Sequence, residues 1–198
     1  MRLLCALMIL LATGQVVAAD SWPRLYAVTG VAADDALNIR SEPRASADKI
    51  GALAPDARDV EIVRRDESGN WGRVNIMEHG GWVAMRYLAA QSPGFDAEYS
   101  GPLHCYGTEP FWSLSADPDG AAEFRFFDAE PAALRAGGRQ PAMGYSDRLR
   151  FALGDSGQAI IRRAECSDGM SNNAFALEID LILDDDRFLT GCCSIAAR

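Results

Sequence analysis

A cysteine, two histidines and a serine are the first side chains of this chain to test for catalytic chemistry. Cys166 opens the segment CSDGMS, and His104 is its candidate base, since the only other histidine is His79. A cysteine hydrolase activates its thiol with such a base, whereas Ser171 in the same segment has no further base of its own. Both histidines precede Cys166 and no βαβ core is recognisable, so we expect no thiol enzyme.

Glu109 lies in the second segment of this kind, CYGTEPFW at 105–112. Acid–base catalysis requires paired groups, and the sequence offers Glu109 no partner. The proline that follows favours an extended backbone, so we expect a strand from Phe111 with Trp112 facing the core and Glu109 capping backbone N–H groups or pairing with an arginine. We therefore predict no catalytic residues and a protein that is not an enzyme.

Metal ions and cofactors are not predicted either. The acidic run 184–186 lacks the glycine and acid spacing of a calcium-binding loop and is typical of a turn between strands. The cysteines lack the Cys-x₂₋₄-Cys pairs of structural zinc sites.

The first nineteen residues, 1–19, have the pattern of a secretory signal peptide. Arg2 precedes the apolar run 3–12, which is too short to span a bilayer, and Val17 and Ala19 occupy the positions before a cleavage site near Ala19. We predict a periplasmic protein with a mature part of 198 − 19 = 179 residues and no membrane span after cleavage.

Cleavage leaves four cysteines, and an even number in an exported chain indicates two disulfides. Neighbouring cysteines rarely bond to each other, and within a strand their side chains point to opposite faces. Cys192 and Cys193 should therefore pair with Cys105 and Cys166. The residues leave the order open, and our prediction is Cys105–Cys193 with Cys166–Cys192.

The net charge of −9 is concentrated in the second half of the chain. Residues 24–90 hold nine basic and ten acidic side chains, a net of −1, whereas residues 91–198 hold nine and seventeen, a net of −8. This distribution disfavours nucleic acid and anionic lipid as partners and favours solubility or a cationic partner.

The first half, residues 24–89, shows short runs with period-two alternation, separated by turns. Leu37 and Ile39 alternate with polar residues, as do Val60 and Ile62, and turn signals stand between the runs. This pattern predicts a compact antiparallel β-barrel.

The phrases ALNIRSEPRASADKIGAL, VEIVRRDESGNWGRV and GGWVAMRYL occur in this half in that order. From about Leu25 to Leu88 the chain resembles a bacterial SH3-like (SH3b) domain. The resemblance implies a five-stranded barrel of the kind attached to cell-wall enzymes, and some members bind peptidoglycan peptides.

The aromatic residues of this half have two explanations. Large side chains at Trp71, Trp82 and Tyr87 are most simply explained as the core of a small domain. Alternatively, Trp71 and Tyr87 belong to a groove for an extended peptide, in which Glu42 would meet an amine and Arg40 a carboxylate. We carry Arg40, Glu42, Trp71 and Tyr87 forward as candidate ligand-binding residues.

Residues 90–102 are rich in turn formers and predict a linker, and residues 103–198 a second domain. Phe175, Leu177, Ile179 and Leu181 share one face of a period-two pattern, and Glu178 and Asp180 share the other, which indicates a strand. Similar runs recur through this half, so we predict an all-β fold with a small, closed or nearly closed antiparallel barrel carrying the disulfides. The segment 130–137 is expected to add one helical turn.

Read in order, CYGTEPFWSLS, CSDGMSN and LTGCC resemble the motifs of an uncharacterised family of exported proteobacterial proteins, distantly similar to small META-type periplasmic barrels. The resemblance covers about residues 104–194. It implies no reaction, and this chain departs from it where NNAFAL replaces the Tyr-Pro that often follows the second motif.

These observations predict a non-enzymatic binding protein of the cell envelope whose SH3-like part contacts peptidoglycan or another envelope peptide or protein. The alternative is an acidic inhibitor or modulator of a cationic cell-wall hydrolase. The third hypothesis is a cell-wall hydrolase acting through Cys166 or Glu109.

Overall fold

The computed structural model describes residues 21–196, so the predicted signal peptide lies outside the described residues. Within that range the chain forms β-strands and one 3₁₀ turn, η1 (Met85–Tyr87), with no α-helix, which confirms the all-β prediction. No helix in the described range is long and apolar enough to cross a bilayer.

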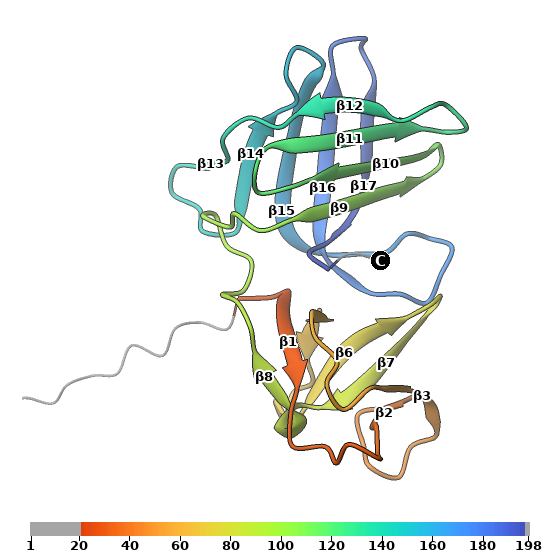
Figure 1. Cartoon of the computed structure of the whole chain (residues 1–198). Coiled ribbons are helices and arrows are strands. Elements are labelled where there is room, and N and C mark those ends of the chain that lie inside the picture. The colour runs from red at the N-terminus through yellow and green to blue at the C-terminus, as the bar shows by residue number, and fades with distance from the viewer. Residues whose placement is uncertain (1–20, 197–198) are drawn as a thin grey trace, which may run out of the picture.

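The strands of the first part form two small antiparallel sheets, in the orders β4-β1-β8 and β3-β2-β7-β6-β5 (Figure 1). The alternation seen in the sequence sets their faces: Leu37 and Ile39 are buried, as are Val60 and Ile62, and they share one core with Val83. The strands are β1 (Arg24–Val28), β2 (Leu37–Arg40), β3 (Lys49–Leu53), β4 (Val60–Ile62), β5 (Arg64–Arg65), β6 (Trp71–Ile76), β7 (His79–Ala84) and β8 (Leu88–Ala90).

The second part is one antiparallel sheet of nine strands in the order β12-β11-β10-β9-β17-β16-β15-β14-β13, curled into a half-barrel (Figure 1). Its strands are β9 (Leu103–Thr108), β10 (Phe111–Ala116), β11 (Ala121–Phe126), β12 (Ala132–Arg135), β13 (Gln140–Pro141), β14 (Arg148–Ala152), β15 (Gly157–Cys166), β16 (Phe175–Leu183) and β17 (Phe188–Ser194).

The concave side of this sheet holds the larger core. Leu177, Ile179 and Leu181 of β16 are fully buried there, as the alternation predicted. Trp112 also enters this core, whereas Phe111 beside it is exposed, which confirms the orientation expected for β10.

The expected helical turn at 130–137 is wrong, because residues 132–135 form strand β12 on the edge of the sheet. The pairing continues beyond β12, where Ala136 forms an isolated antiparallel bridge with Leu153, next to β14. The two sides of the curled sheet therefore touch at this point.

Residues 91–102 connect the two parts without forming a strand, yet two of their aromatic side chains are buried. Phe95 and Tyr99 belong to the core of the nine-stranded sheet, with ring centroids 5.3 Å apart. The connection is thus packed against the second part rather than hanging free.

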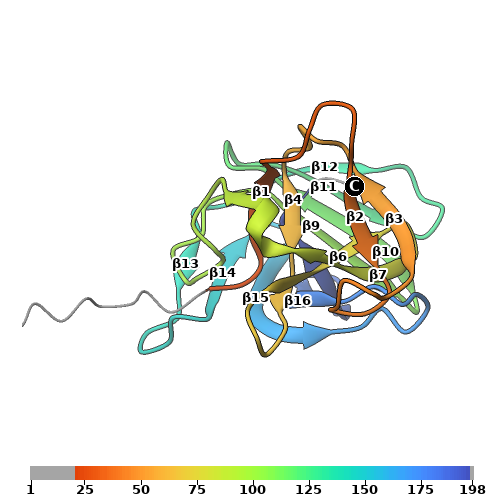
Figure 2. The same ribbon diagram turned by 90° about the horizontal axis from the view of Figure 1, so that it is seen from below.

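Two sets of hydrogen bonds join the parts, and Figure 2 shows the small sheets overlying the end of the large one. At one place the β6–β7 hairpin meets the loop 167–174: Asn75 exchanges two bonds with the Ala174 backbone, and His79 forms a parallel bridge with Asn172. At the other, the Glu61 carboxylate accepts bonds from Ser194 and Ile195.

Candidate functional site

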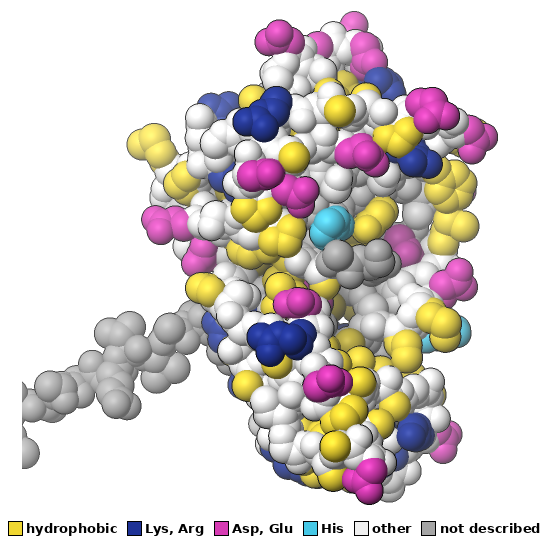
Figure 3. All heavy atoms as spheres, viewed as in Figure 1, with side chains coloured by type: hydrophobic (Ala, Val, Ile, Leu, Met, Phe, Trp, Pro, Cys, Tyr) yellow, Lys and Arg dark blue, Asp and Glu magenta, His cyan; other side chains and the backbone are white. Residues whose placement is uncertain are grey.

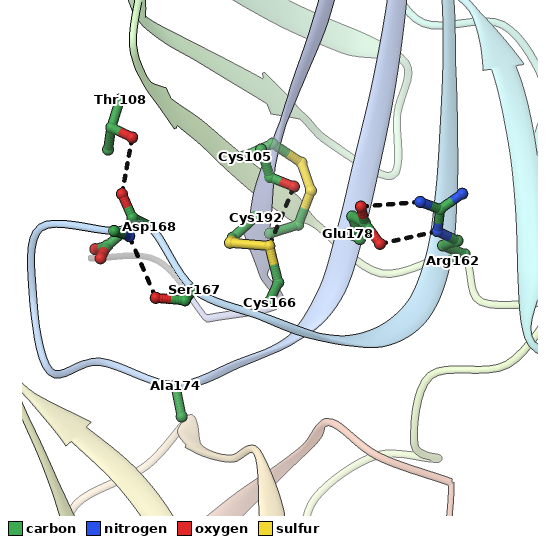
Figure 4. Close-up of a disulfide and its surroundings, with 12 residues drawn as sticks. Cys105, Thr108, Arg162, Cys166, Ser167, Asp168, Ala174, Glu178 and Cys192 are labelled. Atoms are coloured by element: carbon green, nitrogen blue, oxygen red, sulfur yellow. Dashed lines mark hydrogen bonds and ion pairs between the residues drawn. A yellow bond between two sulfur atoms is a disulfide. The ribbon is translucent and has the colours of Figure 1, made fainter.

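The two disulfides are Cys105–Cys193 and Cys166–Cys192, the pairing that we had predicted. Cys105 and Cys193 face each other across β9 and β17 inside the core. Cys192 is buried on the opposite face, where it binds Cys166 at the end of β15 (Figure 4). Two disulfides indicate that the chain folds in an oxidising, extracytoplasmic compartment.

The three sequence motifs of the second part meet around the Cys166–Cys192 bond. They line a cavity of about 330 Å³, to which the first motif contributes 106–109, the second 165–168 and the third 190–192. Segments separated by more than fifty residues are brought together because β9 and β15 lie at either side of the β16–β17 hairpin.

The glycines of the first and third motifs make room for one tryptophan. A side chain at Gly107 or at Gly191 would collide with the Trp112 indole, and one at Gly191 would also strike the Tyr106 carbonyl. This close approach explains why a glycine precedes the Thr-Glu-Pro-Phe-Trp run and another precedes the cysteine pair.

Asp168 of the second motif organises the loop in which it lies. Its carboxylate accepts hydrogen bonds from the backbone N–H groups of Met170 and Ser171 and from the Ser171 hydroxyl. Its carbonyl accepts a bond of 2.8 Å from the Thr108 hydroxyl, so the first and second motifs are joined directly (Figure 4). Ser171 is thus a turn-stabilising residue in this structure.

The cavity is acidic, and its carboxylates differ in how they are paired. Glu178 binds Arg162 at 2.8 Å, and this hydrogen bond raises the pKa of the Arg162 guanidinium. Glu165 reaches Arg64 at 3.7 Å. Glu109 is exposed and has no ion pair or hydrogen bond within residues 21–196, so the structure does not contain the capping or pairing that we expected for it.

The Cys166–Cys192 disulfide bears directly on the thiol mechanism considered for Cys166. Cys166 is bonded to Cys192, so the oxidised chain lacks the thiolate that a Cys–His mechanism requires.

Three of the four candidate ligand-binding residues come together in the first part. Arg40, Trp71 and Tyr87 line one cavity of about 210 Å³, between the loop after β1 and the ends of β2 and β6. Glu42 lies apart from it, exposed and bound to Arg44 at 3.0 Å, and that contact lowers the pKa of the Glu42 carboxyl. Trp71 is half-buried and lines the cavity, and it does not belong to the core shared by Leu37, Ile39 and Val83.

The remaining polar groups of this cavity are positioned by local hydrogen bonds. The Arg40 guanidinium donates to the Ala47 carbonyl at 2.7 Å, which holds it beside the turn. Arg86, which our reading of the sequence did not single out, lines the cavity and lies 4.6 Å from the centre of the Tyr87 ring. In the sequence, only the position of Arg86 next to Tyr87 indicated that it could belong to the same site. The cavity therefore combines two guanidinium groups and two aromatic rings with the carboxylate of Asp35.

A metal-ion site needs several ligand side chains close together. Within the described range, no group of three or more His, Cys, Asp or Glu side chains is arranged to hold a metal ion. The acidic run 184–186 forms the turn between β16 and β17, where Asp185 binds Arg187 at 2.6 Å.

Comparison of the chain with protein-family models, with curated proteins and with solved structures finds no match.

Proposed function

We propose that the protein is a non-enzymatic, exported binding protein of the cell envelope, which acts in the periplasm after removal of a signal peptide. Its first part would bind an extended peptide, such as a peptidoglycan peptide, in the cavity lined by Arg40, Trp71 and Tyr87. The two disulfides support the extracytoplasmic part of this proposal.

The convergence of these three residues carries the proposal. Aromatic rings and arginine are the side chains most enriched where binding energy is concentrated. Arg40 and Arg86 offer donors to a peptide carboxylate, and Trp71 and Tyr87 offer apolar faces to the chain beside it. The resemblance of residues 25–88 to SH3b domains points to the same class of ligand.

Retention on purified cell-wall sacculi tests this function. Mature protein, residues 20–198, should be retained, and Trp71→Ala should bind at least about tenfold more weakly, as for a central aromatic contact. Phe111→Ala is the matched control, because Phe111 is an exposed aromatic residue of the second part. No retention of the wild type, or equal retention of folded Trp71→Ala, would count against the proposal.

A second candidate function rests on the acidic cavity at the motifs. Glu109, Glu165 and Glu178 line it. The half of the chain that contains them carries a net charge of −8, and Figure 3 shows acidic side chains spread over the second part of the molecule. Such a surface would attract a cationic wall hydrolase by long-range electrostatics. The protein should then inhibit lysozyme at low salt, and Glu109→Gln should weaken this inhibition; unchanged lysozyme activity would remove the idea.

A further inference from the structure

A separate cavity of about 460 Å³ lies where the two parts of the molecule meet. The first part contributes Trp22, Val63 and Arg64, and the second part contributes the end of β15 and the start of β16. Ligand cavities of this size occur preferentially at domain interfaces.

The wall formed by β15 is irregular. Arg163 pairs with Leu177 and Cys166 with Phe175, so two residues of β15 stand opposite the single residue Ala176 of β16. This is a β-bulge, a feature that redirects side chains and is over-represented beside functional sites. Both bulged residues, 164 and 165, line the cavity.

Two guanidinium groups at the cavity are weakly engaged. The Arg163 guanidinium donates one hydrogen bond, to the Phe95 carbonyl at 3.4 Å, and its charge helps to lower the pKa of the Asp147 carboxyl. The neighbouring Asp147 carboxylate is bound by Arg148 at 3.0 Å. Arg64 pairs with Glu165 at 3.7 Å, and because both side chains are largely exposed this contact contributes little stability. Arg64 also lies 5.1 Å from the centre of the Trp82 ring. Neither guanidinium has an ion pair shorter than 3.7 Å within residues 21–196, so an anion can compete for both.

A buried amide supplies the third polar group. Asn173 is 8% exposed, lines the cavity and donates from Nδ2 to the Met77 carbonyl at 2.9 Å. Its Oδ1 is buried without a hydrogen-bond partner among the described residues. An unsatisfied buried acceptor is costly, and this one lies on a residue that lines the cavity.

The apolar part of the wall comes from both sides of the cleft. Trp22 is held by stacking on Tyr26 and by the Arg65 guanidinium 5.2 Å from its ring. Opposite it lie Phe175 and three alanine side chains, at 164, 174 and 176. The cleft can therefore accept an apolar group between a fixed indole and small side chains.

We infer that this cleft is a second binding site, which takes the last residue of a peptide with an apolar side chain and a free carboxylate. The carboxylate meets Arg64 and Arg163, and the side chain lies against Trp22. Both arginines line the cavity, and guanidinium groups bind carboxylates through paired, charge-assisted hydrogen bonds. The site is independent of the Trp71 cavity, which shares none of its residues.

Titration calorimetry with N-acetyl-Ala-Leu, as free acid and as carboxamide, tests this site on the mature protein. The acid should bind at least about tenfold more tightly than the amide, the expected value of one charge-assisted hydrogen bond. Arg163→Gln should bring the acid to the level of the amide. Glu165→Gln should tighten binding of the acid alone, because it releases Arg64.

Controls separate this site from the rest of the molecule. Arg150→Gln, at an exposed arginine of the same sheet, and Trp71→Ala should leave binding of the acid unchanged. Ala164→Phe should fill the cleft and abolish binding, while Ala164→Ser should not, and thermal unfolding checks that each variant folds. Absence of binding, equal affinity for acid and amide, loss in Trp71→Ala, or normal binding by folded Arg163→Gln or Ala164→Phe would overturn the inference.

Discussion

Glu61 of the first part binds Ser194 at the end of the last strand of the second part, its carboxylate accepting a hydrogen bond from the buried Ser194 hydroxyl. A second oxygen of the same carboxylate accepts the Ile195 backbone N–H at 3.0 Å. One charged side chain therefore connects the small sheets to the C-terminal end of the large one.

We expect Glu61→Ala to destabilise the protein by about 2–3 kcal/mol, since hydrogen bonds to charged groups are worth more than neutral ones. Urea unfolding of wild type and variant measures the difference. Glu123→Ala is the control, because Glu123 is an exposed strand glutamate of β11, and its effect should lie within about 0.5 kcal/mol. Equal stability of the two variants would contradict the role given to Glu61.

The second connection between the parts predicts a more local effect. Asn75→Ala removes the bonds of 2.8 and 3.0 Å that its amide makes to the Ala174 backbone. We expect a loss of about 1–2 kcal/mol and faster hydrogen exchange in the loop 167–174. Asn172→Ala is the matched control. Asn172 bonds to the β6–β7 hairpin through its backbone, which the substitution keeps, so stability and exchange should stay close to those of the wild type. Equal exchange in both variants would be the contrary result.

The two disulfides should differ in their contribution to stability. Cys105–Cys193 closes a separation of 88 residues and Cys166–Cys192 one of 26. The chain-entropy model gives about 4.6 kcal/mol for the longer loop and about 3.5 kcal/mol for the shorter. Guanidinium unfolding of the two double alanine variants should show this order, and the reverse order would show that native packing, not loop closure, dominates.

His104 should make stability depend on pH. Burial lowers its pKa, against a smaller opposing effect of Asp117, so the unfolded chain binds the proton more readily than the folded one. The stability from neutral His104 is full above its unfolded pKa of about 6.5 and is lost as pH falls through the lower folded pKa. His104→Gln should flatten this decline in thermal unfolding between about pH 7.5 and 5; an unchanged slope would assign the decline to other groups.

Much of the fold is readable from local pattern. Period-two alternation at 37–39 and at 175–181 identified buried strand faces, because a strand exposes alternate residues to opposite sides. The same rule applied to Cys192 and Cys193 correctly required two different partners for them. The prediction for 130–137 was wrong because it considered only the local preference of these residues for a helical turn. In the structure, part of this segment pairs with the free edge of β11 and forms β12.

The candidate sites were readable only in part. Arg40, Trp71 and Tyr87 were chosen separately as residues able to hold a peptide, and the fold placed them around one cavity, with Arg86 added and Glu42 left outside. The cleft between the two parts had no signal in the sequence. Its arginines, 64 and 163, lie almost a hundred residues apart, and Asn173 is an ordinary loop residue until its amide is buried.

By itself, the sequence determined the all-β class, the need for two disulfides and the uneven charge, because these depend on residue type and on spacing along one strand. Only the tertiary structure decided which motifs meet around Cys166–Cys192, and that Glu61 and Asn75 join the two parts. Contacts between distant segments depend on sheet order and curvature, which no local pattern in the chain encodes.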